Sequence, residues 1–325
     1  MGNRLALALL TAVLAAAAAD EGVILVQKGA DSAGIFNART GETLANIPVG
    51  KKPHELVLSA DRRTAYVTNY GVDTYTDLEP GDNTISVIDL QARRKVADIN
   101  LGKYHRPHGI ERGESGRLYV TTDFPAAVLM VDPEQLRVVR EFLLEETLPH
   151  MLAVTRDEKT AVVACAGSAS LTVLSLETGK SSPVEIGGIP MGVILSGDEK
   201  RAYATNRNGE AIAVVDVPRA VLVTKIMLNG APVRLRFTPD RRKLLVTFIG
   251  TGDAAVVDAL TMKLEQRFPV GKAAEGLAFD EKGKFLYITA QGDDRLVKYS
   301  TTDWRQVLEV KTGAKPDTPA VFPLK

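Results

Sequence analysis

Three of the four histidines in this 325-residue chain directly follow a proline. The pairs are Pro53-His54, Pro107-His108 and Pro149-His150. Imidazole nitrogens are ligands for zinc, copper and iron, and three of them around an open coordination position form a common kind of metal site. The first hypothesis is therefore a metal centre, provided that the fold brings the three histidines together.

The three pairs belong to a longer frame that recurs along the chain. Prolines open a similar phrase at Pro53, Pro107, Pro149, Pro190, Pro232 and Pro316, and Ala274 stands in the same frame. After a first interval of 54 residues the spacing is 41 or 42, and a fixed period of this length is typical of a repeat architecture. Starting from the C-terminal copy, the residue after the frame position is Asp317, His54, His108, His150, Met191, Val233 and Glu275.

Each repeat contains four short extended segments bounded by Gly, Asp, Asn and Pro. The copy that opens at Pro53 reads HELVLS, TAYVTN, TISVID and KVADINLG. Four antiparallel strands in about 40 residues are typical of a propeller blade. Near the N-terminus GVILVQKG, AGIFNA and ETLANIPVG supply three strands, and KPDTPAVFPLK supplies one more. We therefore predict that residues 20–325 form an all-β, seven-bladed β-propeller whose first blade is closed by the C-terminal strand. A solenoid would not need complementary partial units at its two ends.

The proline frame is predicted to lie where the chain enters the innermost strand of each blade. Successive connections in an antiparallel blade alternate between the two faces of the disk, so the residue after the frame position should ring one mouth of the central channel. We predict His54, His108, His150, Glu275 and Asp317 as metal ligands on this ring. The alternative is that these histidines have no function. Connector positions in such repeats are expected to be polar, and duplication of the repeat can copy a histidine that binds nothing. If the ring is too wide for one ion, its residues would line a pocket for a larger ligand.

Two insertions fall on the same predicted face as the histidines. They account for the long first interval, with two extra residues in GKYHRPH and ten in YGVDTYTDLEPGDNT. The longer loop, residues 70–84, is predicted to fold over the mouth as an acidic lid, with a solvated surface loop as the alternative. The candidate ligand-binding residues are His105, Asp73, Tyr75 and Met191.

The phrase AYVTNYG followed by NTISVIDLQARRKVADINLG resembles the YVTN-repeat β-propeller family of exported and surface proteins. The strongest copy is Tyr66-Val67-Thr68-Asn69, and weaker copies occupy 203–206 and 287–290. The resemblance covers essentially the whole chain after the N-terminal segment and implies the propeller fold. It does not select a function, because proteins of this fold include haem-associated domains, lactonases, lyases, quinoprotein-associated proteins and plain scaffolds.

The N-terminal segment MGNRLALALLTAVLAAAAAD has one early positive charge, a short apolar run and then small residues. This pattern predicts a signal peptide over residues 1–19, with cleavage after Ala19. The apolar run is too short to span a bilayer well. We therefore expect an exported mature chain, periplasmic or extracellular, without a membrane span.

Composition narrows the function classes further. Lys plus Arg and Asp plus Glu are both 40, so the chain has no global basic field for nucleic acid. The single cysteine, Cys165, can form no internal disulfide and is predicted to be a small buried residue. The chain lacks G-x-S-x-G, P-loop and H-E-x-x-H motifs. Aspartates that recur at two turns of the repeat, such as Asp157 and Asp198, are expected to bond their own backbone.

Three functional hypotheses follow from these patterns. The first is a monomeric exported propeller that binds a small-molecule ligand or an exported protein partner on the histidine face. The second is a propeller that holds a divalent transition metal or a haem and serves periplasmic redox metabolism. The third is a lactonase- or lyase-like enzyme that uses a mouth histidine as general base.

Overall fold

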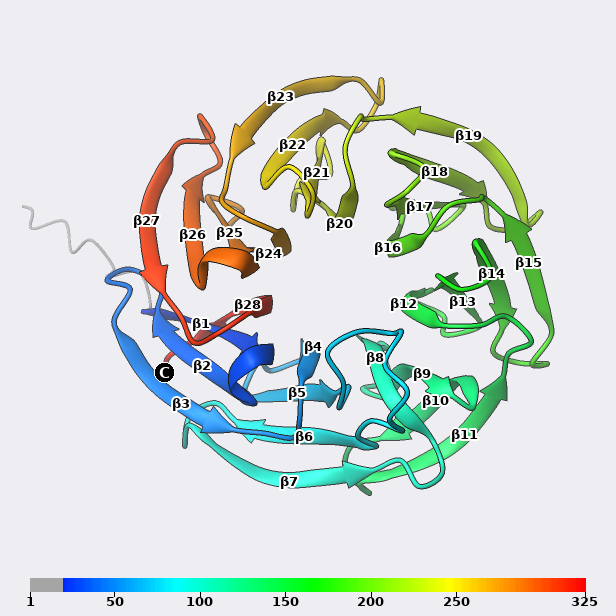
Figure 1. The fold of residues 1–325 in the computed structure, drawn as a ribbon, viewed down its shortest axis with the longest axis horizontal. Coiled ribbons are helices and arrows are strands. Elements are labelled where there is room, and N and C mark those ends of the chain that lie inside the picture. The colour runs from blue at the N-terminus through cyan, green and yellow to red at the C-terminus, as the bar shows by residue number, and fades with distance from the viewer. Residues whose placement is uncertain (1–19) are drawn as a thin grey trace, which may run out of the picture.

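The computed structural model describes residues 20–325, so the predicted signal peptide lies outside the described residues. Within this range, seven four-stranded antiparallel sheets surround a central axis (Figure 1). The only helices among the described residues are two 3-10 turns, η1 (Lys28–Ala30) and η2 (Gln291–Asp293). The prediction of an all-β, seven-bladed propeller is confirmed.

The strands follow the repeat unit by unit. The first blade contains β28 (Pro316–Pro323), β1 (Glu21–Gln27), β2 (Ser32–Asn37) and β3 (Thr43–Pro48). The second and third contain β4 (Pro53–Leu58), β5 (Thr64–Asn69), β6 (Thr84–Asp89) and β7 (Arg94–Asn100), then β8 (His105–Arg112), β9 (Leu118–Phe124), β10 (Ala126–Asp132) and β11 (Arg137–Leu143). The fourth and fifth contain β12 (Pro149–Val154), β13 (Thr160–Cys165), β14 (Ser170–Ser175) and β15 (Ser181–Glu185), then β16 (Pro190–Leu195), β17 (Arg201–Asn206), β18 (Ala211–Asp216) and β19 (Val221–Met227). The sixth and seventh contain β20 (Pro232–Phe237), β21 (Lys243–Phe248), β22 (Asp253–Asp258) and β23 (Leu264–Pro269), then β24 (Ala274–Phe279), β25 (Phe285–Ala290), β26 (Arg295–Ser300) and β27 (Gln306–Lys311).

The two ends of the described chain share the first blade, as predicted. β28 pairs antiparallel with β1, in a register that places Glu21 opposite Pro323 and Leu25 opposite Pro319. The Leu324 amide also donates a hydrogen bond of 2.9 Å to the carbonyl of Asp20. This pairing closes the ring, because without it β1 would present an unpaired inner edge.

The hydrophobic core lies between neighbouring blades rather than within one sheet. One buried cluster, for example, joins Tyr66 and Ile85 of the second blade to Leu118, Val120 and Leu129 of the third. Each sheet is apolar on both faces, so it must be covered on both sides, and stacking around a ring achieves this for all seven blades. Cys165 lies in such an interface and is fully buried, as predicted, and burial raises the pKa of its thiol to about 12.

The threonine of the YVTN motif ties each of four blades to the next. Its buried hydroxyl donates to the carbonyl oxygen of the ring residue in the following blade, at 2.6–2.8 Å. The pairs are Thr68 with His108, Thr121 with His150, Thr205 with Val233 and Thr247 with Glu275. A buried carbonyl needs a donor, so the repeat motif fixes the backbone of the ring position from outside the innermost strand.

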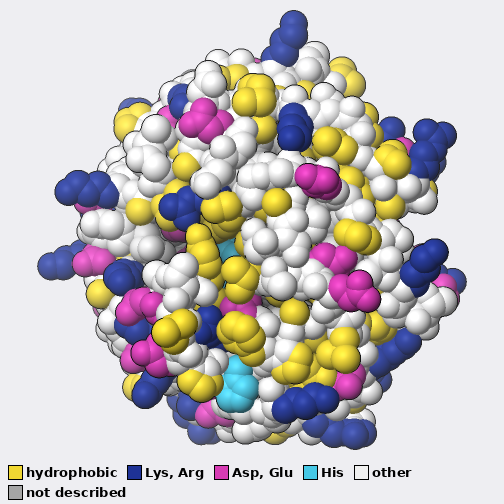
Figure 2. All heavy atoms as spheres, turned by 45° about the vertical axis from the view of Figure 1, so that its right-hand side comes forward, with side chains coloured by type: hydrophobic (Ala, Val, Ile, Leu, Met, Phe, Trp, Pro, Cys, Tyr) yellow, Lys and Arg dark blue, Asp and Glu magenta, His cyan; other side chains and the backbone are white. Residues whose placement is uncertain are grey.

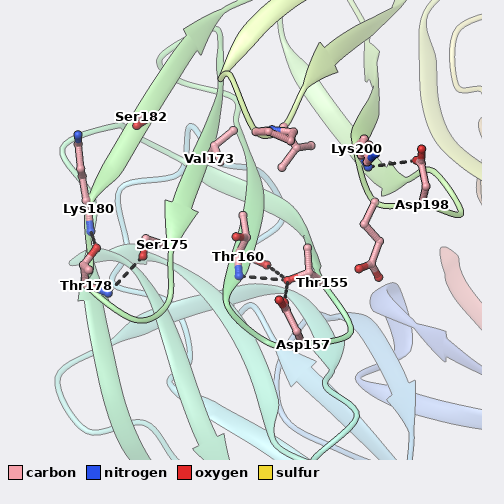
Figure 3. A pocket seen from close by; sticks show the side chains of 13 residues that line it. Thr155, Asp157, Thr160, Val173, Ser175, Thr178, Lys180, Ser182, Asp198 and Lys200 are labelled. Carbon is pink, nitrogen blue, oxygen red and sulfur yellow. Dashed lines mark hydrogen bonds between the residues drawn. The ribbon is translucent and has the colours of Figure 1, made fainter.

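The recurring turn aspartates form the local bonds predicted for them. Asp157 accepts from the Thr155 hydroxyl at 2.7 Å (Figure 3). It also accepts from the Lys159 amide at 3.1 Å. Asp198 accepts from the Lys200 amide at 3.2 Å in the neighbouring blade (Figure 3). A surface groove of about 490 Å³ lies between these turns. Because their carboxylates are used within their own turns, we interpret both aspartates as structural.

Candidate ligand site at the histidine mouth

Three imidazole rings lie against one another at one mouth of the channel. The ring centroids of His54 and His108 are 4.1 Å apart, and those of His108 and His150 are 3.8 Å apart. His108 is buried, whereas His54 and His150 are partly exposed. Figure 2 shows two histidine patches on this side of the molecule, a small one near the centre of the view and a larger one nearer its lower edge. The predicted convergence of the three residues is found in the structure.

The start of each inner strand explains this convergence. Lys52, Arg106 and Leu148 stand immediately before the three prolines with φ of 47–55°, in the left-handed region that non-glycine residues rarely adopt. These residues turn the chain sharply into the inner strand, and a register shift follows each proline. One detail differs from the sequence-based expectation: β8 begins at His105, two residues before the proline frame, because the insertion pairs His105 with Phe124.

The His54 side chain faces two carboxylates. Its Nδ1 lies 3.3 Å from Asp317 Oδ2 and 3.6 Å from Glu55 Oε1. One ligand atom each from His54, Glu55 and His108 can be chosen so that all lie within 4.8 Å of one another. The Nδ1 atoms of His54 and His108 are both buried without a hydrogen-bond partner among the described residues. Buried polar atoms are normally satisfied, so these two nitrogens indicate a site for a missing partner.

His150 is oriented by the backbone of Met191. Its Nδ1 lies 3.1 Å from the Met191 carbonyl oxygen, so this nitrogen carries the proton and donates it. The lone pair then remains on Nε2. Metal-ligating histidines are commonly held in this way by a carbonyl on the other ring nitrogen. Met191, predicted from sequence as a ligand-binding residue, contributes here through its carbonyl.

An ion pair crosses the channel directly beneath the histidines. Arg234 Nη2 contacts Glu55 Oε1 and lies 3.8 Å from Asp317 Oδ1. The Thr318 hydroxyl donates to the other oxygen of Glu55. β20 and β4, which carry Arg234 and Glu55, belong to blades on different sides of the ring (Figure 1). Burial alone would raise the pKa of Glu55, but the Arg234 charge and its hydrogen bonds hold that pKa at about 2.

The remaining charges around the mouth are one base and two acids. Lys28, from η1, places its Nζ 5.9 Å from the centroid of the Tyr70 ring, and burial lowers its pKa against the attraction of Asp317. Burial raises the pKa of Glu275 and of Asp317, and the Gln291 amide donates to Asp317 at 3.2 Å. Of the three carboxyl groups at the mouth, only Glu55 is held firmly in the charged form, and Arg234 balances that charge.

All three mouth histidines are held in the neutral form. Burial, assisted by the Lys28 charge, lowers the pKa of His54 to about 4. Burial also lowers the pKa of His108 and of His150 well below the usual value, with further lowering by neighbouring positive charges. Neutral imidazole is the form that coordinates a metal, so at neutral pH these side chains need not lose a proton before binding one.

The lowered histidine pKa values predict that the folded protein loses stability as the pH falls below about 6.5. Unfolded imidazoles take up protons near pH 6.5, whereas folded His54 stays neutral down to about 4. One such group costs up to about 1.4 kcal/mol per pH unit across this window. Glu275 and Asp317 act in the opposite direction, because the folded protein binds their protons more readily. Urea unfolding of the parent and of His150→Gln between pH 7 and 5 isolates the histidine effect. The variant should show the smaller loss of stability, and parallel curves would contradict the assignment.

The loop over residues 70–84 is anchored at the mouth. The Tyr70 ring lies edge-on to His54 and His108, at centroid distances of 5.7 and 5.2 Å, and its hydroxyl donates to Asp123 at 2.6 Å. The fully buried guanidinium of Arg106 donates to three loop carbonyls, of residues 75, 77 and 79. The loop therefore covers one side of the mouth.

The remaining sequence-predicted ligand residues lie at the edge of this loop. Asp73 pairs with Lys52 at 3.3 Å and with Lys315 at 3.2 Å, so its carboxylate is already engaged. The Tyr75 side chain is exposed. His105 lies against the loop, with Nδ1 3.5 Å from the Gly81 carbonyl, and it makes no ring contact with the other histidines in the described part of the chain.

Four residues around the mouth were not predicted from the sequence: Glu55, Arg234, Thr318 and Lys28. Glu55, Arg234 and Thr318 occupy the second residue after the frame position, a position that could have been compared around the ring. The copies there are Thr318, Glu55, Gly109, Met151, Gly192, Arg234 and Gly276. The glycines allow neighbouring inner strands to approach closely, since a Cβ on Gly109 would lie 2.5 Å from the His150 carbonyl oxygen. Lys28 comes from a turn outside the repeat pattern, and no signal in the sequence marks it.

Comparison with known proteins supports the fold but not a specific activity. The chain is 23% identical over 244 residues to the uncharacterized protein YncE of Salmonella typhimurium. The aligned region covers 74% of this chain and 54% of that protein. The chain thus spans about half the length of this curated relative. No family model matches the chain.

Solved structures of similar shape come from proteins with different activities. A periplasmic gluconolactonase of Pseudomonas aeruginosa, PpgL, has a TM-score of 0.75 at 17% identity and covers 94% of this chain and all of that chain. Hydrazine synthase of Kuenenia stuttgartiensis has a TM-score of 0.74 at 17% identity, and the match covers 86% of this chain and 92% of that chain. The dihydro-heme d1 dehydrogenase NirN has a TM-score of 0.68 at 14% identity, and the match covers 93% of this chain and 75% of that chain. At these identities the likeness establishes the propeller fold alone.

Proposed function

We propose that this protein is an exported binding propeller whose histidine mouth holds a divalent transition-metal ion. The ligands would be His54 and His108, together with a carboxylate of Glu55 or Asp317. The observation that carries the proposal is the cluster of ligand atoms of His54, Glu55 and His108 within 4.8 Å of one another, together with the buried His108 Nδ1 that has no hydrogen-bond partner among the described residues. Imidazole and carboxylate together suit zinc, copper, nickel or iron, and the ring of His150 lies next to that of His108, with centroids 3.8 Å apart.

Export rests on the N-terminal pattern and on the exported proteins that share the repeat phrase. None of the described helices is long and apolar enough to cross a membrane. The solved propellers of similar shape include a protein described as periplasmic. A mouth that holds a metal in that compartment would present it to a small ligand or to an exported partner, and the fold leaves both uses open.

A second candidate function is a lactonase- or lyase-like reaction with His54 as general base. It is favoured by the 3.3 Å approach of Asp317 to His54 Nδ1, because a carboxylate that orients an imidazole is a recurring catalytic arrangement. The pKa of His54, held at about 4, argues against it, because such an imidazole is a weak base at neutral pH. We therefore rank metal binding first.

Metal binding is expected to raise the melting temperature of the mature protein. A ligand that binds only the folded state at one hundred times its Kd adds about 2.7 kcal/mol of stability. Zn(II), Cu(II) and Ni(II), each added to chelator-treated protein at pH 7.5, are the probes. The shift should fade as the pH falls toward the pKa of His54, because protonated imidazole cannot coordinate.

The double variant His54→Ala with His108→Ala should lose this shift. The matched control is His105→Ala, which removes an imidazole on the same face but outside the cluster. An unchanged metal response in the double variant would refute the site. Lactone hydrolysis by the metal-free parent that is lost in His54→Ala would instead support the second candidate. An absorption band of bound haem in the purified protein would redirect the proposal to that cofactor.

A further inference from the structure

A funnel occupies the other end of the channel, beyond the ion pair of Arg234 and Glu55. It has a volume of about 830 Å³ and is lined by the inner strands and by the turns that follow them. Glu55, Arg234 and Thr318 form its floor. The three mouth histidines do not line it, because they project on the opposite side of the floor. The funnel is therefore a compartment separate from the histidine mouth.

The floor of the funnel offers unused hydrogen-bond donors. Arg234 is 6% exposed, and its Nη2 is engaged by Glu55, whereas its Nε and Nη1 are buried without a partner among the described residues. A buried guanidinium that keeps two free N–H groups is costly unless an acceptor reaches it. The strongest acceptor for a guanidinium is a carboxylate or another oxyanion.

The walls combine apolar surface with a few charges. Met151, Ile194, Leu195 and Leu277 are among the apolar lining residues. Acidic and basic lining residues are equal in number: Glu55, Glu111, Glu114, Glu199, Asp280 and Glu281 against Arg62, Arg112, Arg156, Arg234, Arg236 and Arg241. Several of these are paired with each other, as Arg62 is with Glu281 and Arg156 with Glu199. The free donors on the floor, rather than a net field, therefore determine what binds.

We infer that this funnel is a second binding site, for a small organic carboxylate with an apolar body. The carboxylate would accept hydrogen bonds from Nε and Nη1 of Arg234, and the apolar body would lie along Met151 and Leu277. The volume is within the range of ordinary small-molecule pockets. This inference uses no histidine, although the funnel floor shares Glu55 with the proposed metal site.

The test compares matched carboxylate and alcohol probes by calorimetry and thermal shift on the mature protein. The pairs are benzoate with benzyl alcohol and octanoate with 1-octanol. At least one carboxylate should bind, about tenfold or more tighter than its alcohol, the difference expected when a charge-assisted hydrogen bond is lost. Equal binding within both pairs, or no binding by either carboxylate, would overturn the inference.

Two variants locate the binding. Arg234→Lys retains the charge opposite Glu55 but removes the Nε and Nη1 donors, so carboxylate affinity should fall about tenfold or more. Met151→Trp fills the funnel without touching the ion pair and should abolish binding, which keeps the test decisive if the lysine variant does not fold. His108→Ala, at the other mouth, should bind as the parent does. Loss of carboxylate binding in His108→Ala would place the site at the histidines and refute the funnel.

Discussion

Replacing Arg234 by methionine is expected to lower the free energy of unfolding by about 3–5 kcal/mol at pH 7. Methionine approximates the volume of the arginine stem but leaves Glu55 buried and unpaired, beside Asp317 and Glu275. A buried carboxylate without its partner pays the full cost of desolvation. Urea unfolding, followed by circular dichroism at pH 7, measures the loss.

The double variant Arg234→Met with Glu55→Gln separates the ion pair from simple packing. Once the unpaired charge is removed as well, most of the lost stability should return, because replacing both partners of a buried pair is often nearly neutral. Glu55→Gln alone leaves the Thr318 hydrogen bond an acceptor and is the matched single variant. If the double variant is as unstable as Arg234→Met, the ion pair is not what holds the floor of the channel together.

Removing residues 314–325 is expected to abolish cooperative folding. The deletion takes away all of β28, exposes the inner edge of β1 and removes the buried side chains of Val321 and Phe322. It also removes Asp317 and Thr318 from the central cluster. An open edge strand with apolar faces promotes intermolecular pairing, so the truncated protein should aggregate.

Thermal unfolding and size-exclusion chromatography of the truncated protein test this expectation. The control lacks only Lys325, which is exposed and lies beyond the β28 ladder, and it should melt like the parent. A monomeric product of the 314–325 deletion with a parental melting temperature would show that the other strands close the ring unaided.

The propeller, its closure and the place of the histidines could be predicted because they depend on a period. A repeat near 42 residues puts the same frame position in every blade, so the identity of one position can be read around the ring. His54, His108 and His150 are near neighbours for that reason alone. Turn aspartates such as Asp157 were equally predictable, since their bonds are local in sequence.

The contacts that cross the channel could not be predicted in the same way. Arg234 and Glu55 are 179 residues apart in the sequence. A repeat reveals which residues lie at the same depth of the channel, but not which side chains make contact across it. The contacts of the loop over residues 70–84 were not predictable either. Its acidic residues suggested charges aimed at the mouth, yet Asp73 is paired with Lys52 and Lys315, and the contact with the histidines is made by Tyr70. These partners depend on three-dimensional packing that the repeat does not encode.

The closing pair of strands also sets the order in which the protein becomes functional during its synthesis. β1 and β28 are separated by roughly 300 residues of chain, so their pairing is among the most non-local contacts a chain of this size can make. Because β28 carries Asp317 and Thr318, one of the two carboxyl groups beside His54 and the hydroxyl that bonds Glu55 in the floor are in place only after that strand has docked. A nascent or prematurely terminated product therefore holds its histidines beside Glu55 but without Asp317. A ligand that uses Asp317 would then add stability only to finished molecules, and its binding would distinguish them from incomplete ones.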